Sequence, residues 1–332
     1  MLTVARRAGV SIASVSRVLN GLSASPEMEL RVRAATKALG YVPDARARSL
    51  KAGRTMQLGF AVGDIANPVY VEMMRSIEEL TTHGGFRLLL HSTGSDPLNE
   101  IDLIDGLGRN YVDGLIFIPL RITPELLRSL RRAPVPVVII GSLAEGEPLD
   151  AVRADSRLGA ALAVEHLAVA GRRSIALLNG DPSTVPGAAR HEGYRAGLAG
   201  VAMPYDAGLV AVGGAFTYAA GHAAAIELFS RARPDAIFCA SDLIAVGAMR
   251  ALADLGLAVP DDVAVVGMDD TELARMSTPA LSSVSLGSTE RARIAARLLL
   301  ERLVDPTLAP RRHTVAPTLM VRESSAVRSA SS

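Results

Sequence analysis

The sequence predicts an α/β protein in which a small all-helical head precedes a larger body of two doubly wound, mostly parallel sheets. Three observations predict this. The chain has 332 residues, enough for two or three domains. Its first 54 residues are basic, and their apolar residues recur at the spacing expected for helices. From residue 58 on, short apolar runs alternate with helical stretches, as expected for strands and helices in alternation. With 49% hydrophobic and 21% charged residues, the chain can bury a sizeable core.

The net charge of +1 is unevenly distributed. Residues 1–54 hold 10 Lys and Arg against 3 Asp and Glu, which leaves 25 basic and 31 acidic residues for the rest of the chain. A basic head on an acidic body favours contact between the head and a polyanion, although a basic run is also compatible with a merely solvated face.

The head predicts three helices. The first, residues 3–8, ends at Gly9, which can take the positive φ of a tight turn. Ser11 is a good N-cap for a second helix over residues 11–19, which buries Val15, Val18 and Leu19. Ser25 and Pro26 begin a third helix that stops near Gly40. The first two helices and their glycine turn form a helix-turn-helix, whose second helix enters the major groove of DNA.

The outer face of that second helix supplies side chains for DNA. Arg17 is suited to a bidentate contact with a guanine. Short polar groups suit phosphate oxygens; these are Ser11, Ser14, Ser16 and Asn20. Ile12 and Ala13 are exposed on the same face.

A linker over residues 43–54 carries Arg46, Arg48 and Lys51 with Leu50 among them. Asp44 can cap a short helix there. Two interpretations stay open: a solvated linker helix, or a helix on DNA whose leucine wedges into the minor groove and bends the duplex.

The body contains seven apolar runs that predict strands in two sheets, covered by helices on both faces. They are residues 58–62, 86–90, 114–118, 135–140, 174–178, 236–239 and 263–267. The segments after them are polar and rich in turn residues. In such sheets a ligand binds beyond the carboxyl ends of the strands.

Several kinds of chemistry have little support. The sequence has no glycine-rich nucleotide loop, no G-x-S-x-G elbow and no histidines at metal-ligand spacing, so we expect neither an enzyme nor a cofactor. Cys239 lies in an apolar run and is interpreted as a buried small side chain rather than a reactive thiol. No export signal or membrane span is evident, which favours the cytoplasm.

The head resembles that of the lactose-repressor (LacI/GalR) family. The resemblance is carried by residues 8–21, AGVSIASVSRVLNG, by LGYVP at 39–43 and by ARSL at 47–50. It implies that Ile12, Ala13 and Arg17 read bases, and that Ala47 and Leu50 lie in the minor groove at the centre of an operator. It also implies a homodimer with one hinge helix from each subunit.

The resemblance extends through the body to residues 321–324. Such a body is similar to periplasmic sugar-binding proteins, with a ligand cleft between two subdomains. We therefore expect a head at 1–42, a hinge at 43–54 and an effector-binding domain at 55–323. Its N-subdomain is placed at 55–154 and 286–318, its C-subdomain at 155–285 and 319–323, and a disordered tail at 324–332.

The resemblance also implies effector contacts. Arg190 and Asp269 come first, as an arginine fork facing a carboxylate; the alternative is a structural salt bridge. Phe216 is placed to stack on the ligand, or lies in the core. The remaining candidates are Asn67 and Tyr70, which cap a helix, line the cleft or both, together with His91 and Ser241.

An apolar stripe that includes Met73 and Met74 is interpreted as core, with a share in a dimer interface. The favoured function is thus a transcriptional repressor that binds double-stranded operator DNA as a dimer and answers to a small molecule. A sugar is the first choice for the effector and a purine or nucleoside the second. The alternatives are a solute-binding protein of a transporter and an enzyme on an α/β frame.

Overall fold

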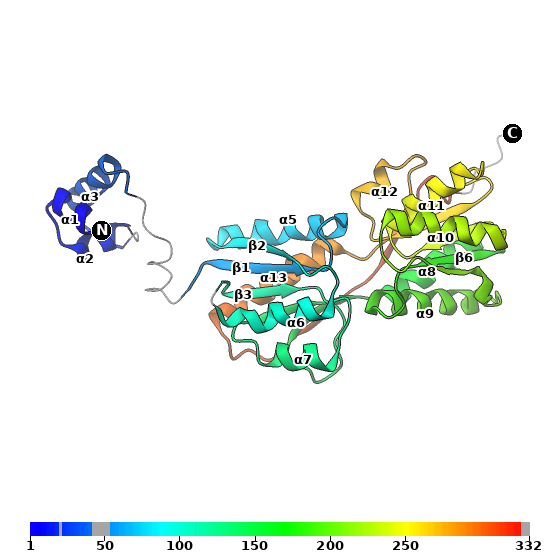
Figure 1. Cartoon of the computed structure of the whole chain (residues 1–332), viewed down its shortest axis with the longest axis horizontal. Helices are drawn as coiled ribbons and strands as arrows, with labels where there is room; N and C mark the ends of the chain where they lie inside the picture. The colour runs from blue at the N-terminus through cyan, green and yellow to red at the C-terminus, as the bar shows by residue number, and fades with distance from the viewer. Residues whose placement is uncertain (20–21, 42–53, 110, 327–332) are drawn as a thin grey trace. The chain divides into compact units, whose positions relative to one another are not determined.

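The computed structural model describes residues 1–19, 22–41, 54–109 and 111–326 (Figure 1). It consists of two compact units, a head of residues Met1–Met56 and a body of residues Gln57–Ser332.

The head contains the three expected helices, α1 (Leu2–Ala8), α2 (Ile12–Leu19) and α3 (Pro26–Ala38). Gly9 ends α1 with a φ of 63°, and Ser25 caps α3 by accepting a hydrogen bond from Met28 N. The buried residues of its core are small, and Leu19, Met28 and Tyr41 pack against them half-buried; the buried set is Val4, Ala5, Ala8, Val15, Val18, Val32 and Ala35. A core this small gives little hydrophobic stabilisation.

Arg31 joins α3 to the end of α1. Its Nε donates to Ala8 O at 2.9 Å and its Nη2 donates to Gly9 O at 3.1 Å. The last carbonyls of α1 therefore have partners. This arginine serves the fold of the head rather than its outer surface.

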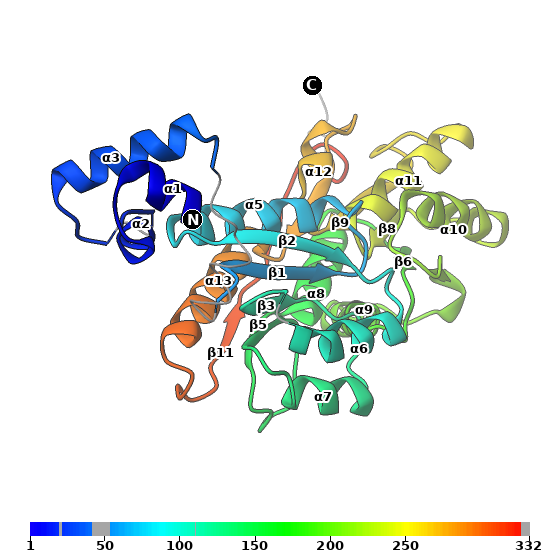
Figure 2. The same cartoon turned by 60° about the vertical axis from the view of Figure 1, so that its left-hand side comes forward.

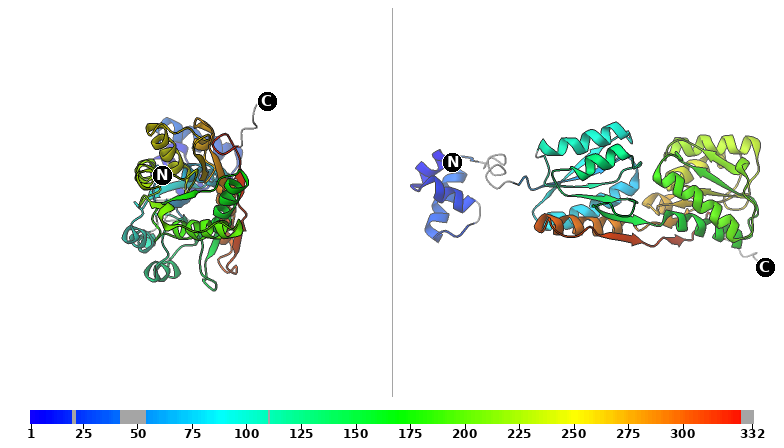
Figure 3. Two further views of the ribbon diagram at one scale, coloured as in Figure 1. Left: turned by 90° about the vertical axis from the view of Figure 1, so that its right-hand side faces the viewer. Right: turned by 90° about the horizontal axis from the view of Figure 1, so that it is seen from below.

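The body contains two six-stranded sheets, which define an N-lobe and a C-lobe (Figure 3). The N-lobe sheet has the order β11-β5-β4-β3-β1-β2 and is parallel throughout. Its strands are β1 (Gln57–Val62), β2 (Arg87–Ser92), β3 (Gly114–Phe117), β4 (Val137–Ile140), β5 (Asp150–Ala154) and β11 (Arg312–Val315).

The C-lobe sheet has the order β12-β10-β9-β8-β6-β7. It is parallel except for the antiparallel pair β10–β12. Its strands are β6 (Ile175–Asn179), β7 (Val210–Val212), β8 (Ala236–Cys239), β9 (Ala264–Met268), β10 (Ser282–Ser285) and β12 (Thr318–Met320). The seven expected strands are present. The other five strands, which are short or polar, were not among the apolar runs that predicted strands.

Helices cover both faces of each sheet, so each lobe has two hydrophobic cores. The N-lobe helices are α5 (Pro68–His83), α6 (Pro97–Asp105), η1 (Gly106–Arg109), α7 (Pro124–Arg131) and α13 (Ser288–Val304). The C-lobe helices are α8 (Ser156–Val169), α9 (Val185–Gly200), η2 (Ala207–Leu209), α10 (Tyr218–Arg231), α11 (Asp242–Asp254) and α12 (Glu272–Met276). Cys239 is fully buried in the C-lobe, where burial raises the pKa of its thiol.

The chain passes between the lobes after β5, after β10 and after β11. These three connections place the carboxyl ends of the parallel strands of the two sheets on either side of one cleft.

Glycine permits the closest helix contacts of the C-lobe. A Cβ atom at Gly193 of α9 would lie 2.2 Å from the Arg157 carbonyl oxygen of α8. A Cβ atom at Gly247 of α11 would lie 2.2 Å from the Tyr218 carbonyl oxygen of α10. Neither helix pair can approach this closely with a larger residue.

The expectation of a disordered tail from residue 324 is wrong for its first residues. Ser324 and Ser325 are 0% and 2% exposed. Ser324 Oγ accepts from Ser282 N at 2.8 Å and donates to Val265 O, while Ser325 Oγ bonds His166 Nε2 at 2.7 Å. Short polar side chains look like a tail in the sequence, but here they satisfy buried backbone groups between strands. Residues 327–332 lie outside the described part of the chain.

Candidate functional site

The outer face of α2 presents the predicted DNA-reading side chains. Ser11, Ala13 and Arg17 are exposed, and Ile12 is 46% exposed although it is apolar. Ser11 stands at the N-cap, where its Oγ accepts from Ser14 N at 3.0 Å. An exposed isoleucine in the first turn of a helix suits a thymine methyl group.

Ser16 differs from the expectation. It was placed on the outer face, but it is only 8% exposed and belongs to the buried side of α2 together with Val15. Position 16 lies about 100° around the helix from Val15 and about 60° from Leu19, at the edge of the side that packs against α1 and α3. Asn20, Ala47 and Leu50 lie outside the described residues.

The Arg17 guanidinium donates from Nη2 to Ser23 O at 3.2 Å. The contact is exposed and involves one nitrogen of the guanidinium. The side chain is therefore free to change its rotamer on meeting a base edge.

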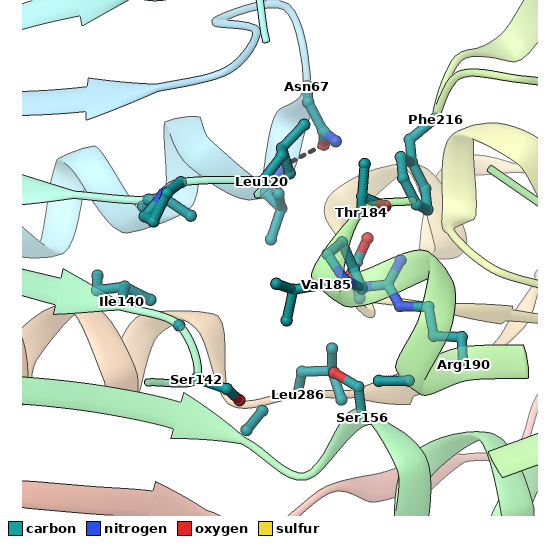
Figure 4. Close-up of a pocket in the computed structure, with 18 of the residues that line it drawn as sticks. Asn67, Leu120, Ile140, Ser142, Ser156, Thr184, Val185, Arg190, Phe216 and Leu286 are labelled. Atoms are coloured by element: carbon teal, nitrogen blue, oxygen red, sulfur yellow. Dashed lines mark hydrogen bonds and ion pairs between the residues drawn. The ribbon is translucent and has the colours of Figure 1, made fainter. Parts of the chain in front are cut away.

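The body encloses a cavity of about 570 Å³ between its lobes (Figure 4). One wall follows the carboxyl ends of β1, β3 and β4 and holds Asp64, Asn67, Tyr70, Ile118, Leu120, Ile140 and Ser142. The facing wall comes from the C-lobe and holds Thr184, Val185, Arg190, Phe216, Thr217 and Asp269. A cavity beyond the carboxyl ends of parallel strands is where ligands of this class of sheet bind.

Arg190 and Asp269 face each other inside this cavity. The Arg190 Nη2 donates to Asp269 Oδ1 at 3.3 Å, and both side chains are only 8% exposed. Arg190 also donates from Nη1 to Ala240 O, whereas its buried Nε has no partner among the described residues. Arg190 and Asp269 are thus held in place, while the Nε of Arg190 still lacks a hydrogen-bond acceptor among the described residues.

Asp269 has an unusual backbone for a non-glycine residue, with a φ of 110°. Burial raises the pKa of its carboxyl group, and the charges of Arg190 and Arg291 oppose that rise. Backbone strain of this kind persists where the surrounding structure holds it, often at ligand sites.

Asp242 supports the loop that carries Asp269. Its carboxylate accepts from Thr271 N at 2.7 Å, from Thr271 Oγ1 at 2.9 Å and from Ser283 Oγ at 2.5 Å. Burial and the neighbouring Asp269 raise the pKa of Asp242 to about 7. This side chain positions the loop between β9 and α12 rather than reaching the cavity.

Three further predicted residues line the cavity. Phe216 packs against the Arg190 guanidinium, with 5.3 Å between the ring centroid and Cζ. Asn67 caps α5 by accepting from Val69 N at 3.1 Å and also lines the cavity, so both of its expected positions hold (Figure 4). Burial, with Asp269 nearby, raises the pKa of Tyr70 to about 12, which keeps its phenol protonated and able to donate.

The structure does not bring His91 or Ser241 into the cavity. His91 is exposed on β2, the edge strand of the N-lobe sheet, and is not among the residues that line the cavity. Ser241 is 2% exposed and accepts from Ile244 N as the N-cap of α11. The capping hydrogen bond holds this short hydroxyl at the start of α11, whereas a longer amide side chain at the same position would extend further.

Sequence reasoning missed Arg291, which lines the cavity from the first turn of α13. Its Nε donates to Leu286 O at 2.9 Å. Burial, together with the charge of Arg190, lowers the pKa of Arg291 to about 10, and Asp269 opposes the shift. In the sequence it is one of three arginines within seven residues, and nothing there distinguishes it from Arg293 or Arg297.

Polar contacts bridge the mouth of the cavity. Arg121 of the N-lobe pairs with Asp181 of the C-lobe, and its Nε donates to Ser183 Oγ at 3.2 Å. Val185 N donates to Leu120 O at 2.8 Å. On another side of the cleft, Glu72 accepts from the backbone nitrogen of Glu272 at 3.1 Å. These bonds exist only while the lobes are this close.

The described residues contain no group of three or more His, Cys, Asp or Glu side chains that could hold a metal ion. A helix long and apolar enough to cross a membrane is likewise absent from the described part of the chain.

Comparison with known proteins gives two family matches. Residues 1–44 match the model of bacterial regulatory proteins of the lacI family, and residues 164–325 match a periplasmic binding protein-like domain.

Similar proteins cover almost the whole chain. The ribose operon repressor of Escherichia coli K12 is 35% identical over 98% of this chain and 99% of its own length. The transcriptional regulator CelR of Thermobifida fusca is 37% identical over 97% and 96%. Among solved structures, a CelR–cellobiose complex has a TM-score of 0.75 at 35% identity, covering 97% of this chain and 98% of that one. A Lac repressor dimer bound to operator and an anti-inducer has a TM-score of 0.87 at 25% identity, covering 98% of each chain.

Proposed function

The chain belongs to the lacI family of bacterial regulatory proteins and is a DNA-binding transcriptional regulator; from this premise we propose that it is a dimeric repressor whose operator binding is controlled by a sugar-like effector in the cleft. The enclosed Arg190–Asp269 pair, with a donor left unmet at the cavity, carries the effector half of the proposal.

The DNA half rests on α2. Arg17 and Ile12 offer a base-reading cation and an apolar contact from one exposed face, and Ser11, Ser14 and Ala13 surround them. Asn20 belongs to the same proposal as a short polar group suited to a phosphate oxygen, and Ala47 and Leu50 belong to it by resemblance, all three from sequence alone.

The edge strand β2 supports a dimer (Figure 2). Leu89 and Leu90 are 41% and 43% exposed on it, and Leu98 at the start of α6 is 70% exposed. An edge strand with exposed leucines is normally covered. Because the solved Lac repressor relative is a dimer, we assign this edge to a second copy of the chain. His91 then belongs to that interface rather than to the effector.

The cavity suits a polyol. Its volume of about 570 Å³ lies in the range of ligand sites. Polar groups on both walls offer donors and acceptors, while Ile118, Val185 and Phe216 offer apolar faces. Relatives named for ribose and a relative solved with cellobiose favour a sugar over a purine.

The two lobes couple effector binding in the cleft to operator binding by the heads. A ligand held by Asn67 on one wall and Arg190 on the other stabilises one inter-lobe angle, and the Arg121–Asp181 bridge persists only at that angle. The hinge at residues 43–54 would transmit the angle to the heads, with a coupling energy of about 1–3 kcal/mol.

A solute-binding protein of a transporter would use the same cleft. The head disfavours that alternative, because its exposed α2 has no use in solute capture. No catalytic role is proposed for the cleft residues.

The test is Asp269→Ala in the full-length protein. We expect effector binding, measured by calorimetry, to fall by at least about tenfold, because Arg190 loses its orienting partner. Operator affinity without ligand should stay within a factor of two or so.

The matched control is Asp254→Ala, which removes an exposed carboxylate from α11 of the same lobe. It should leave both affinities unchanged. Full effector affinity in Asp269→Ala would remove that residue from the site, and an operator affinity insensitive to every sugar tested would refute effector control.

A further inference from the structure

We propose that the effector carries an anionic group, a carboxylate or a phosphate, and that Arg291 and Arg190 bind this group together. The inference rests on the proposed function, since it names the chemical class of ligand for the same cavity. The effector would thus be a sugar acid or a sugar phosphate rather than a neutral sugar.

The inner part of the cavity has an excess of positive charge. Two guanidinium groups, Arg190 and Arg291, share one lining carboxylate, Asp269. Burial lowers the pKa of Arg291, and the nearby charge of Arg190 lowers it further, while Asp269 opposes the shift. An additional anion between them would relieve that repulsion.

The donors of both arginines are incompletely used. Among the described residues, the Arg291 side chain makes one hydrogen bond, from Nε to Leu286 O, so its two terminal nitrogens keep their protons for a ligand. The Arg190 Nε is buried and has no partner in the same set of residues. A buried donor without a partner costs free energy comparable to a lost hydrogen bond, and a ligand oxygen would recover it.

The other acidic residues at the cavity do not neutralise these arginines. Asp64 accepts from Ala66 N, Asp155 caps α8 through Leu158 N, and Asp181 pairs with Arg121. Glu72 lies within electrostatic range of Asp269 but does not line the cavity, and its two oxygens accept from Glu272 N and Ser288 Oγ.

The remaining lining arginines belong to the rim. Arg153 and Arg157 are exposed, and Arg153 donates to Thr314 Oγ1. The excess charge is therefore specific to the inner pair.

A neutral sugar fits this arrangement less well. Hydroxyl oxygens can accept from guanidinium groups, but they carry no charge to offset two neighbouring cations, whereas a carboxylate or a phosphate does. Carboxylate and phosphate groups also match the planar fork of an arginine. Asp269 would still accept hydroxyl protons from the sugar part, and Phe216 would cover its apolar face.

The first experiment asks whether the inner pair binds an anion at all. Thermal unfolding of the full-length protein is measured in millimolar inorganic phosphate against chloride at equal ionic strength. Wild type should gain stability in phosphate. Arg291→Met should lose that gain, Arg291→Lys should keep most of it, and Arg293→Met should keep all of it.

Arg293→Met is the matched control, since it removes an exposed arginine two residues along the same helix. An equal phosphate effect in Arg291→Met and Arg293→Met overturns the inference. Loss of the effect in Arg291→Met alone supports it.

The second experiment identifies the anionic group and separates this inference from the proposed function. Calorimetry compares ribose with ribose 5-phosphate, and glucose with glucuronate and glucose 6-phosphate. We expect the anionic member of a binding pair to bind at least about tenfold tighter, and Arg291→Met to abolish that preference.

Each result has one meaning. Preference for phosphate esters indicates a sugar phosphate, and preference for glucuronate indicates a sugar acid. Tighter binding of neutral sugars, with operator release, overturns the anionic class and leaves the proposed function intact. If neither neutral nor anionic ligands change operator binding while phosphate still protects through Arg291, the proposed function fails and the anion site remains.

Discussion

The head and the body use their side chains in opposite ways. The head exposes its proposed DNA-reading residues, Ile12 and Arg17, over a small core whose fully buried residues are valines and alanines. The body encloses its proposed effector contacts, such as Arg190 and Asp269, between two lobes with two cores each. A small core suffices where a partner as large as DNA completes the surface, whereas a small ligand needs a site that is already enclosed.

The comparison predicts that the head fails first when its core is weakened. Val15 is fully buried in the head. Val15→Ala should remove about 1–3 kcal/mol, enough to unfold a core of this size. Operator binding should be lost and amide exchange in residues 1–41 should accelerate, while the melting of the body stays unchanged.

Leu30→Ala is the control for Val15→Ala, because Leu30 is 71% exposed in the same head. It should keep operator binding. If the head stays folded in Val15→Ala, the prediction that the head is less stable than the body is wrong.

The body should be most sensitive where its helices touch. Gly193→Ala places a methyl group against the Arg157 carbonyl, so we expect a loss of about 3 kcal/mol in the free energy of unfolding. Arg190 lies one turn earlier on α9, so effector affinity should fall as well.

Gly200→Ala is the matched substitution on α9, since the nearest atom to its Cβ would lie 3.8 Å away. Chemical denaturation of both variants measures the difference. Equal stability would show that α8 and α9 can separate without cost.

Arg17→Ala tests whether the head acts through exposed side chains. We expect specific operator affinity to fall by about ten- to a hundredfold, as for loss of one bidentate base contact. Effector binding should not change. Arg33→Ala removes the same charge from an exposed position on α3, where Arg33 pairs with Glu29.

Arg33→Ala should lower operator and random-duplex affinity alike, by less than Arg17→Ala. Fluorescence anisotropy with both duplexes compares the variants. If both variants lose the same operator affinity, Arg17 contributes only its positive charge and does not read a base.

A pH-dependent effect involves Glu100, a carboxyl group enclosed in the N-lobe. It is 2% exposed, and its Oε1 has no partner among the described residues. Burial raises its pKa from an ordinary value of 4.5 to about 7. The folded state therefore holds this proton more tightly than the unfolded state does, and stability is lost as the pH rises from about 4.5 to 7.

Glu100→Gln removes that titration. The variant should gain about 2–3 kcal/mol on wild type at pH 8 relative to pH 5. Denaturation at both pH values measures this, and Glu78→Gln, at an exposed position, is the control. A constant difference between Glu100→Gln and wild type at the two pH values would contradict the raised pKa.

By itself, the sequence determined the head, the apolar strands and the family. Each of these features depends on a short stretch of consecutive residues. Gly9 and Ser11 set the turn and the cap of the helix-turn-helix, and continuous apolar runs mark seven strands. Local backbone preference and local periodicity decide such features, so no distant residue is needed to predict them.

Only the tertiary structure decided which side chains meet at the cavity. Arg190 and Asp269 are 79 residues apart, and Arg291 reaches the same cavity from a helix near the end of the body. It also decided that Ser16 is buried, that Ser241 is a cap, that His91 lies on an edge, and that Ser324 is packed. Burial and facing depend on which elements pack over a residue, and that packing is fixed by contacts between segments far apart in the chain.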